Sequence, residues 1–369
     1  MDSTIILRMN RRLIYLLIFC FSTPAFAQEL SVSIDMASAE KICQLLSQKK
    51  ADTIELKKAA GLYGNQLLIK KVKGYSGAGE DVFINTLKEI IETGTIKGRD
   101  EYNWKLVKEK LPEINQLLNY IRSNNRVFIE EVKAIIQPYL PKELKAAAKA
   151  CFLAGGGSLG FTIGNDPSFN VALQKIGDDI KGLQYLVAHE LYHSLQDIGQ
   201  SSRVYQKDDK KITYPEKATY YLLYNLWAEG IANFVGDMAA IKDLKEFSKE
   251  QAGQYQKNRA RRYQNFQLLE ALLYRQYHDS TANYQATYDI GFSTAFDETS
   301  YFVGYEMAKK IAQHQGNEAI AALLVKDPIR FIADYIALYQ KLADDQSFVR
   351  FSRSTEEIVS RLLAWENKL

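Results

Sequence analysis

Cysteine, proline and histidine are all scarce in this chain of 369 residues, which contains 3 Cys, 7 Pro and 4 His. Cys43 and Cys151 are the only cysteines after the first 27 residues, so a framework of several disulfides is excluded. These two residues form either one disulfide or two buried thiols, and neither has neighbours typical of a nucleophile or a metal ligand. Few prolines and no low-complexity linker also argue against loosely tethered domains.

The chain lacks a surplus of charge of either sign. It has 47 Lys and Arg against 44 Asp and Glu, which gives a formal net charge of +3. Its short lysine pairs are scattered, and they favour solvated surface over a continuous basic face. No nucleic-acid partner is therefore expected.

Long apolar runs are also missing, apart from a short one near the start of the chain. Three arginines between positions 8 and 12 precede the apolar stretch Leu13–Phe21, and Ala25-Phe26-Ala27 follows it. This order is typical of a cleaved secretory signal peptide, here residues 1–27. Nine apolar residues are too few for a stable membrane span, so the sequence predicts an exported protein, either periplasmic or secreted.

The remaining residues predict a mainly α protein with a small β-sheet, organised as a helical N-terminal region at 28–150 and a second region at 151–369. We expect the two regions to form one compact unit. Apolar residues recur at helical spacing in segments 40–47, 82–92, 104–121 and 127–139. Short strands are expected at Phe152–Ala154, Leu159–Ile163 and Val171–Leu173. Residues 201–214 and 280–299 are expected to be loops, residues 300–315 a helix, and residues 317–369 further amphipathic helices.

His189-Glu190-Leu191-Tyr192-His193 is the most informative segment, because it uses two of the four histidines. Two His at positions i and i+4 of a helix project from one side and can bind the same metal ion. Glu190 then lies beside the metal, where it can accept a proton from water. Leu183, Val187 and Leu191 fall on the opposite, apolar side. The alternative is a core or surface histidine pair without a metal.

A third ligand is expected on a second helix, predicted at Pro215–Ile241. Asn225, Glu229, Asn233 and Asp237 recur every four residues along this otherwise apolar segment. Buried carboxylates and amides are costly unless they are paired or bind a metal, which favours Glu229 as a ligand. Small residues flank Glu229 and would let another helix approach closely. A solvated polar face is the alternative.

The motif H-E-x-x-H, followed 36 residues later by Glu229 in an E-G-x-A segment, resembles the gluzincin class of zinc metallopeptidases. The stretch from about Cys151 to Phe234 also resembles a group of bacterial secreted zinc-dependent peptidases. The resemblance implies a zincin-like core, a Zn²⁺ ion held by His189, His193 and Glu229, and Glu190 as general base.

The resemblance further implies an acidic residue, four positions after the ligand Glu, that orients the first His. This chain has Asn233 there, which can still accept the imidazole N–H, and Asp237 is the alternative. Zincins also place an edge strand before the active-site helix, where an extended peptide pairs with it.

The residue that stabilises the oxyanion is the least certain part of the predicted site. Tyr301 and Tyr305 belong to a Tyr-Phe-Val-Gly-Tyr run that resembles a segment downstream of the ligand Glu in related peptidases. His278 is the competing candidate, and His314 is expected to serve the C-terminus of its helix instead.

The sequence therefore predicts an exported zinc-dependent peptidase that acts on a peptide or protein substrate. The alternatives are a zinc hydrolase acting on a non-peptide bond, an inactive peptide-binding protein of zincin fold, and a helical interaction protein without a metal. Metal content separates the last from the others.

Overall fold

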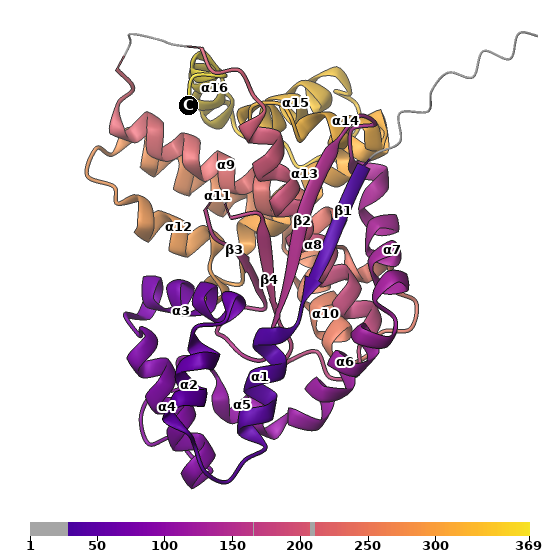
Figure 1. Ribbon diagram of the computed structural model, residues 1–369. Helices are drawn as coiled ribbons and strands as arrows, with labels where there is room; N and C mark the ends of the chain where they lie inside the picture. Colours follow the sequence, from indigo (N-terminus) through magenta and orange to yellow (C-terminus); the bar gives the residue numbers. More distant parts are fainter. Residues whose placement is uncertain (1–28, 165, 207–210) are drawn as a thin grey trace, which may run out of the picture.

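The computed structural model describes residues 29–164, 166–206 and 211–369, and it confirms a mainly α fold with one small sheet (Figure 1). The predicted signal peptide lies outside these residues. The strands are β1 (Glu29–Asp35), β2 (Lys145–Leu153), β3 (Gly160–Thr162) and β4 (Ser168–Ala172). They lie in the order β1-β2-β4-β3. The first three in this order are parallel to one another, and β3 pairs antiparallel with β4 at the edge.

The sheet differs from the sequence-based expectation at β1 and β2. β1 was not predicted, although its exposed and half-buried residues alternate, because its partner lies more than a hundred residues further along the chain. Glu29 pairs with Lys145 and Asp35 with Cys151. β2 begins in Lys-Ala-Ala-Ala-Lys, a segment of good helix formers that pairing on both edges holds extended.

The N-terminal region supplies one group of helices, drawn in indigo to purple below and beside the sheet in Figure 1. They are α1 (Ala37–Leu46), α2 (Thr53–Ala60), α3 (Tyr63–Ser76), α4 (Glu80–Thr93), α5 (Trp104–Glu109), α6 (Leu111–Ser123) and α7 (Asn125–Ile136), followed by the short 3-10 helix η1 (Gln137–Tyr139). The expected helical segments coincide with α1, α4, α5 to α6, and α7. One correction concerns segment 104–121, which breaks at Lys110, where Pro112 enters the first turn of α6.

Helix α8 (Ile180–Ser201) carries the His-Glu-x-x-His segment and packs on β2, β3 and β4. Asp179 caps its N-terminus by accepting a hydrogen bond from the backbone N–H of Gly182 at 2.7 Å. The predicted apolar side is confirmed, since Leu183, Val187 and Leu191 are fully buried. Gly199 does not end the helix as predicted. It lies inside α8, where a Cβ would meet the carbonyl oxygen of Leu324 at 2.2 Å.

Helix α9 (Tyr214–Val235) begins with a capping box between Thr213 and Glu216. It ends at Gly236, six residues before the predicted end, so Asp237 lies outside the helix and caps the 3-10 helix η2 (Met238–Ala240). The expected close helix contact is present. A Cβ on Gly230 would meet the Cα of Gly304 at 2.4 Å, so the backbones of α9 and a later helix touch at these glycines.

The remaining helices surround α9 and form the upper part of the molecule in Figure 1. They are α10 (Glu246–Ala260), α11 (Arg262–His278), α12 (Tyr284–Phe292), α13 (Thr299–Gln315), α14 (Asn317–Leu323), α15 (Ile329–Lys341) and α16 (Arg353–Leu362), with short 3-10 helices η3 (Thr294–Phe296) and η4 (Leu363–Trp365). α13 confirms the predicted helix at 300–315. α12 was expected to be loop, yet Asn283 caps it.

Within the described ranges, Cys43 and Cys151 are both free and buried, so they do not form a disulfide with each other. The same part of the chain contains no helix that is long and apolar enough to cross a membrane.

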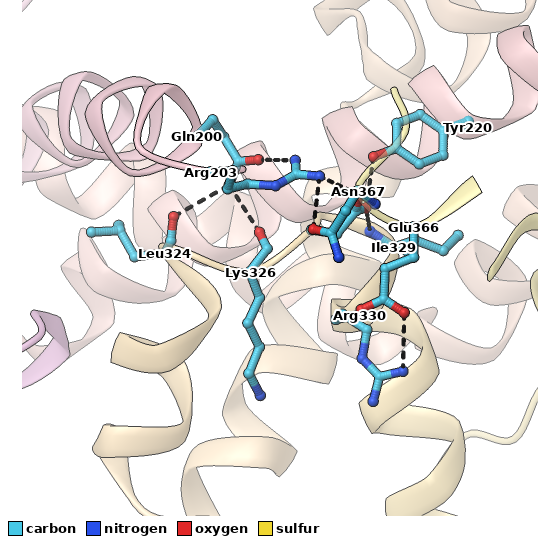
Figure 2. A network of polar contacts seen from close by, with 10 residues as sticks. Gln200, Arg203, Tyr220, Leu324, Lys326, Ile329, Arg330, Glu366 and Asn367 are labelled. Atoms are coloured by element: carbon cyan, nitrogen blue, oxygen red, sulfur yellow. Dashed lines mark hydrogen bonds and ion pairs between the residues drawn. The ribbon is translucent and has the colours of Figure 1, made fainter. Parts of the chain in front are cut away.

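A buried ion pair joins the end of α8 to the C-terminal helices (Figure 2). The Arg203 side chain is 4% exposed and pairs with Asp327, which is 0% exposed. Asp327 also accepts hydrogen bonds from the Tyr220 hydroxyl at 2.6 Å and from the Asn367 backbone N–H at 2.7 Å. Each of these donors comes from a different part of the chain, so one carboxylate ties α8, α9 and the C-terminus together.

Replacing Asp327 by Ala is expected to lower the free energy of unfolding by about 3–5 kcal/mol, because it leaves the buried Arg203 guanidinium unpaired. Urea denaturation of the metal-free protein measures this change. Glu357→Ala is the matched control. It breaks an ion pair with Arg353 in which the two side chains are 56% and 91% exposed, and such pairs contribute about 0–1 kcal/mol. Equal losses in both variants would show that the buried pair has no special weight.

Candidate metal centre

Three side chains predicted as ligands converge from two helices. His189 and His193 project from α8, and Glu229 projects from α9. The Nε2 atoms of the two histidines are 3.1 Å apart, and Oε2 of Glu229 lies 3.2 Å from His193 Nε2 and 3.8 Å from His189 Nε2. All three side chains are between 13% and 18% exposed, so they are largely buried but open to solvent.

These distances suit one tetrahedral metal ion. Donor atoms about 2.0–2.2 Å from such a zinc ion lie about 3.3–3.6 Å apart, close to the observed separations. Two imidazoles and one carboxylate are also a donor set typical of catalytic zinc. Among the described residues, this is the group of His, Cys, Asp and Glu side chains close enough to share an ion.

The hydrogen bonds that orient the two histidines differ from the expected ones. His189 bonds to the backbone carbonyl of Ala232, one residue before Asn233. His193 Nδ1 lies 2.9 Å from Oε1 of Gln196, a residue that the sequence reasoning missed. Its spacing of three residues after His193 was the available signal, because such residues are neighbours on a helix.

The charges in the site are strongly coupled. Burial lowers the pKa of His189 to about 3. Burial also opposes a charge on His193, but the adjacent Glu229 carboxylate outweighs it and raises the His193 pKa to about 9. Burial likewise opposes a charge on Glu229, but the two histidines and a hydrogen bond from Tyr301 lower its pKa. The metal-free site thus holds a carboxylate and an imidazolium side by side, and a dication can replace the proton.

Glu190 lies against the edge strand of the sheet and is 6% exposed. A Cβ on Gly160 of β3 would come within 2.2 Å of Oε1 of Glu190, so a glycine is required where the carboxyl group packs on the strand. Burial raises the pKa of Glu190 to about 7, reinforced by the charge of Glu229 and opposed by His193 and Lys71. The structure therefore places a carboxyl group of moderate basicity beside the three ligands.

The structure brings Tyr301 to the site but not Tyr305 or His278. Tyr301, half-buried in the first turn of α13, hydrogen-bonds through its side chain to Glu229. The Tyr305 hydroxyl instead donates to Oδ2 of Asp237 at 2.6 Å. His278 is exposed at the end of α11, stacked beside Tyr274 at a centroid distance of 4.5 Å. The catalytic role of each of these residues stays a prediction.

A helix with two histidines and a second helix with a glutamate define a metal-binding protein of mainly α fold. Residues 56–344 match the family described as "Putative zinc dependent peptidase (DUF5700)". This match covers well over half of the chain, so the protein belongs to that family. No curated protein sequence and no solved structure match it.

Proposed function

We propose that this protein is an exported zinc-dependent peptidase of the gluzincin class. The convergence of His189, His193 and Glu229, with Glu190 beside them, carries the proposal. The family to which the chain belongs is described as a zinc-dependent peptidase, which supports the same assignment. Export rests on the predicted signal peptide at residues 1–27 and places the mature protein in the periplasm or outside the cell.

Zinc bound by the three ligands would supply Lewis acidity, polarising the substrate carbonyl and lowering the pKa of water towards about 7. Glu190 accepts the proton of the attacking water and later delivers it to the leaving amine. Its packing against Gly160 holds the carboxyl group beside the ligands throughout. Tyr301 is the nearest hydroxyl donor for the oxyanion, because it already reaches Glu229.

The edge strand β3 is the proposed place for the substrate backbone. Within the described residues, β3 pairs with β4 on one side only. An extended peptide that paired with its other side would run beside Glu190, since Gly160 belongs to this strand. Backbone pairing does not depend on side chains, which favours peptide or protein substrates over other acyl compounds.

The proposal is tested by incubating purified residues 28–369 with a mixed peptide library and analysing the products by mass spectrometry. We expect about one zinc per chain, cleavage of peptides, loss of cleavage on chelation, and recovery when zinc is added back. Zinc uptake with ester or other non-peptide hydrolysis would support the alternative hydrolase. Zinc uptake without any turnover would support a peptide-binding protein. Folded protein that takes up no metal would contradict the central proposal.

Replacing Tyr301 by Phe is expected to reduce kcat by about a hundred- to a thousandfold with unchanged zinc content, because it removes one oxyanion donor. Tyr305→Phe is the matched control from the same helix, since its hydroxyl is held by Asp237, and it should leave kcat within a few fold. Weaker zinc binding by Tyr301→Phe at normal kcat would instead assign Tyr301 to the orientation of Glu229.

A further inference from the structure

Gln196 joins the two ligand-bearing helices at the metal centre. It lies three residues after His193 on α8 and is 1% exposed. Oε1 of its amide faces Nδ1 of His193 at 2.9 Å. Its Nε2 donates to the backbone carbonyl of Ala228 on α9 at 3.1 Å, next to Glu229 in the chain. A single buried amide therefore contacts one ligand directly and the neighbour of another.

The orientation of this amide follows from its partners. A carbonyl oxygen can only accept, so the NH₂ group of Gln196 must face Ala228. Oε1 must then face His193, and because Oε1 can only accept, the hydrogen of that bond belongs to Nδ1. The reverse orientation would place two oxygens against each other at Ala228. The backbone of α9 thereby determines which nitrogen of His193 carries a proton.

The opposite nitrogen of His193, Nε2, faces His189 and Glu229. When the proton of a neutral imidazole lies on Nδ1, the lone pair lies on Nε2, which is the state needed to bind a metal. We propose that Gln196 is a positioning residue that holds His193 in its metal-binding tautomer and ties that ligand to the helix of Glu229. This inference rests on the proposed zinc site for its function, but the hydrogen bond itself exists without metal.

The variant Gln196→Met tests the proposal, because Met is similar in length and neither donates to Ala228 nor accepts from the imidazole as an amide does. Gln200→Met is the matched control. Gln200 is another buried amide on α8, but it donates to the carbonyls of Leu324 and Lys326, away from the ligands. Loss of Gln200 should lower stability to unfolding without changing the metal site.

Two readouts are needed. Long-range ¹H–¹⁵N NMR of the metal-free protein should show a slowly exchanging Nδ1–H on His193 in the parent and in Gln200→Met, and its loss in Gln196→Met. Four histidines make these signals assignable. Competition with a chromophoric chelator should show zinc affinity about 10–100-fold lower in Gln196→Met than in the other two proteins.

A slowly exchanging Nδ1–H and parental zinc affinity in Gln196→Met would overturn the inference. An equal loss of affinity in Gln196→Met and Gln200→Met would also overturn it, because general destabilisation would then explain both. If the parent takes up no zinc, the proposed function fails, and the Nδ1–H signal still decides whether Gln196 holds His193.

Discussion

The variant Glu190→Gln is expected to keep its zinc and to lose about a hundred- to ten-thousandfold in kcat, the usual range for removal of a general base. The amide matches the carboxyl group in shape, so it fits against Gly160 of β3 as Glu190 does. It cannot accept the proton of the attacking water. The measurement is kcat on a peptide identified from the library, with zinc content determined for the same samples.

Stability provides a separate check on this variant. Burial raises the pKa of Glu190 to about 7, above the ordinary value of 4.5 that applies to the unfolded chain. The folded metal-free parent therefore binds the Glu190 proton more tightly, and this group makes stability fall as the pH rises from about 4.5 to 7. Glu190→Gln removes that loss, so at pH 8 the metal-free variant should be at least as stable as the parent. Turnover at the parental rate in a zinc-loaded variant would show that Glu190 is not the base.

The second large effect is expected from removal of a ligand. His193→Ala or Glu229→Ala should lower zinc affinity by more than the about 10–100-fold that is typical for loss of an orienting partner, because a direct metal bond is lost. Activity at limiting zinc should disappear with the metal. Zinc per chain, measured by elemental analysis after dialysis against a weak chelator, distinguishes this from a folding defect when thermal unfolding is recorded in parallel.

His314→Ala is the matched control for the ligand variants. His314 pairs with Asp345 at 3.7 Å near the C-terminus of α13 and has no printed contact with the three ligands. Its loss should leave both zinc content and turnover unchanged. Zinc retained at parental affinity in His193→Ala and Glu229→Ala would place the metal elsewhere or remove it from the mechanism.

Local periodicity was enough to predict the central chemistry. His189 and His193 lie one helical turn apart, and their position opposite the buried side of α8 follows from spacing alone. Glu229 could be predicted from its place in a polar row within an apolar helix. Capping by Asp179 was also readable, because a cap depends on residues a few positions away.

Contacts between distant segments decided the features that the sequence left open. β1 is a strand only because it pairs with β2, and the helix-forming start of β2 is extended for the same reason. The contact of Gly230 with Gly304 brings α13 to the site. The structure then shows Tyr301 on Glu229 and Tyr305 on Asp237, a distinction that four residues of helical spacing cannot reveal.

The orienting groups show the same division most clearly. The sequence offered Asn233 and Asp237, both one or two turns after Glu229, as partners for a histidine. The structure instead uses the Ala232 carbonyl for His189 and Gln196 for His193. A backbone carbonyl leaves no trace in the residue pattern, and the role of Gln196 depends on where α9 places the carbonyl of Ala228. By itself the sequence determined which residues can bind a metal, because ligand spacing is local, whereas the packing of α8 against α9 decided how those ligands are held.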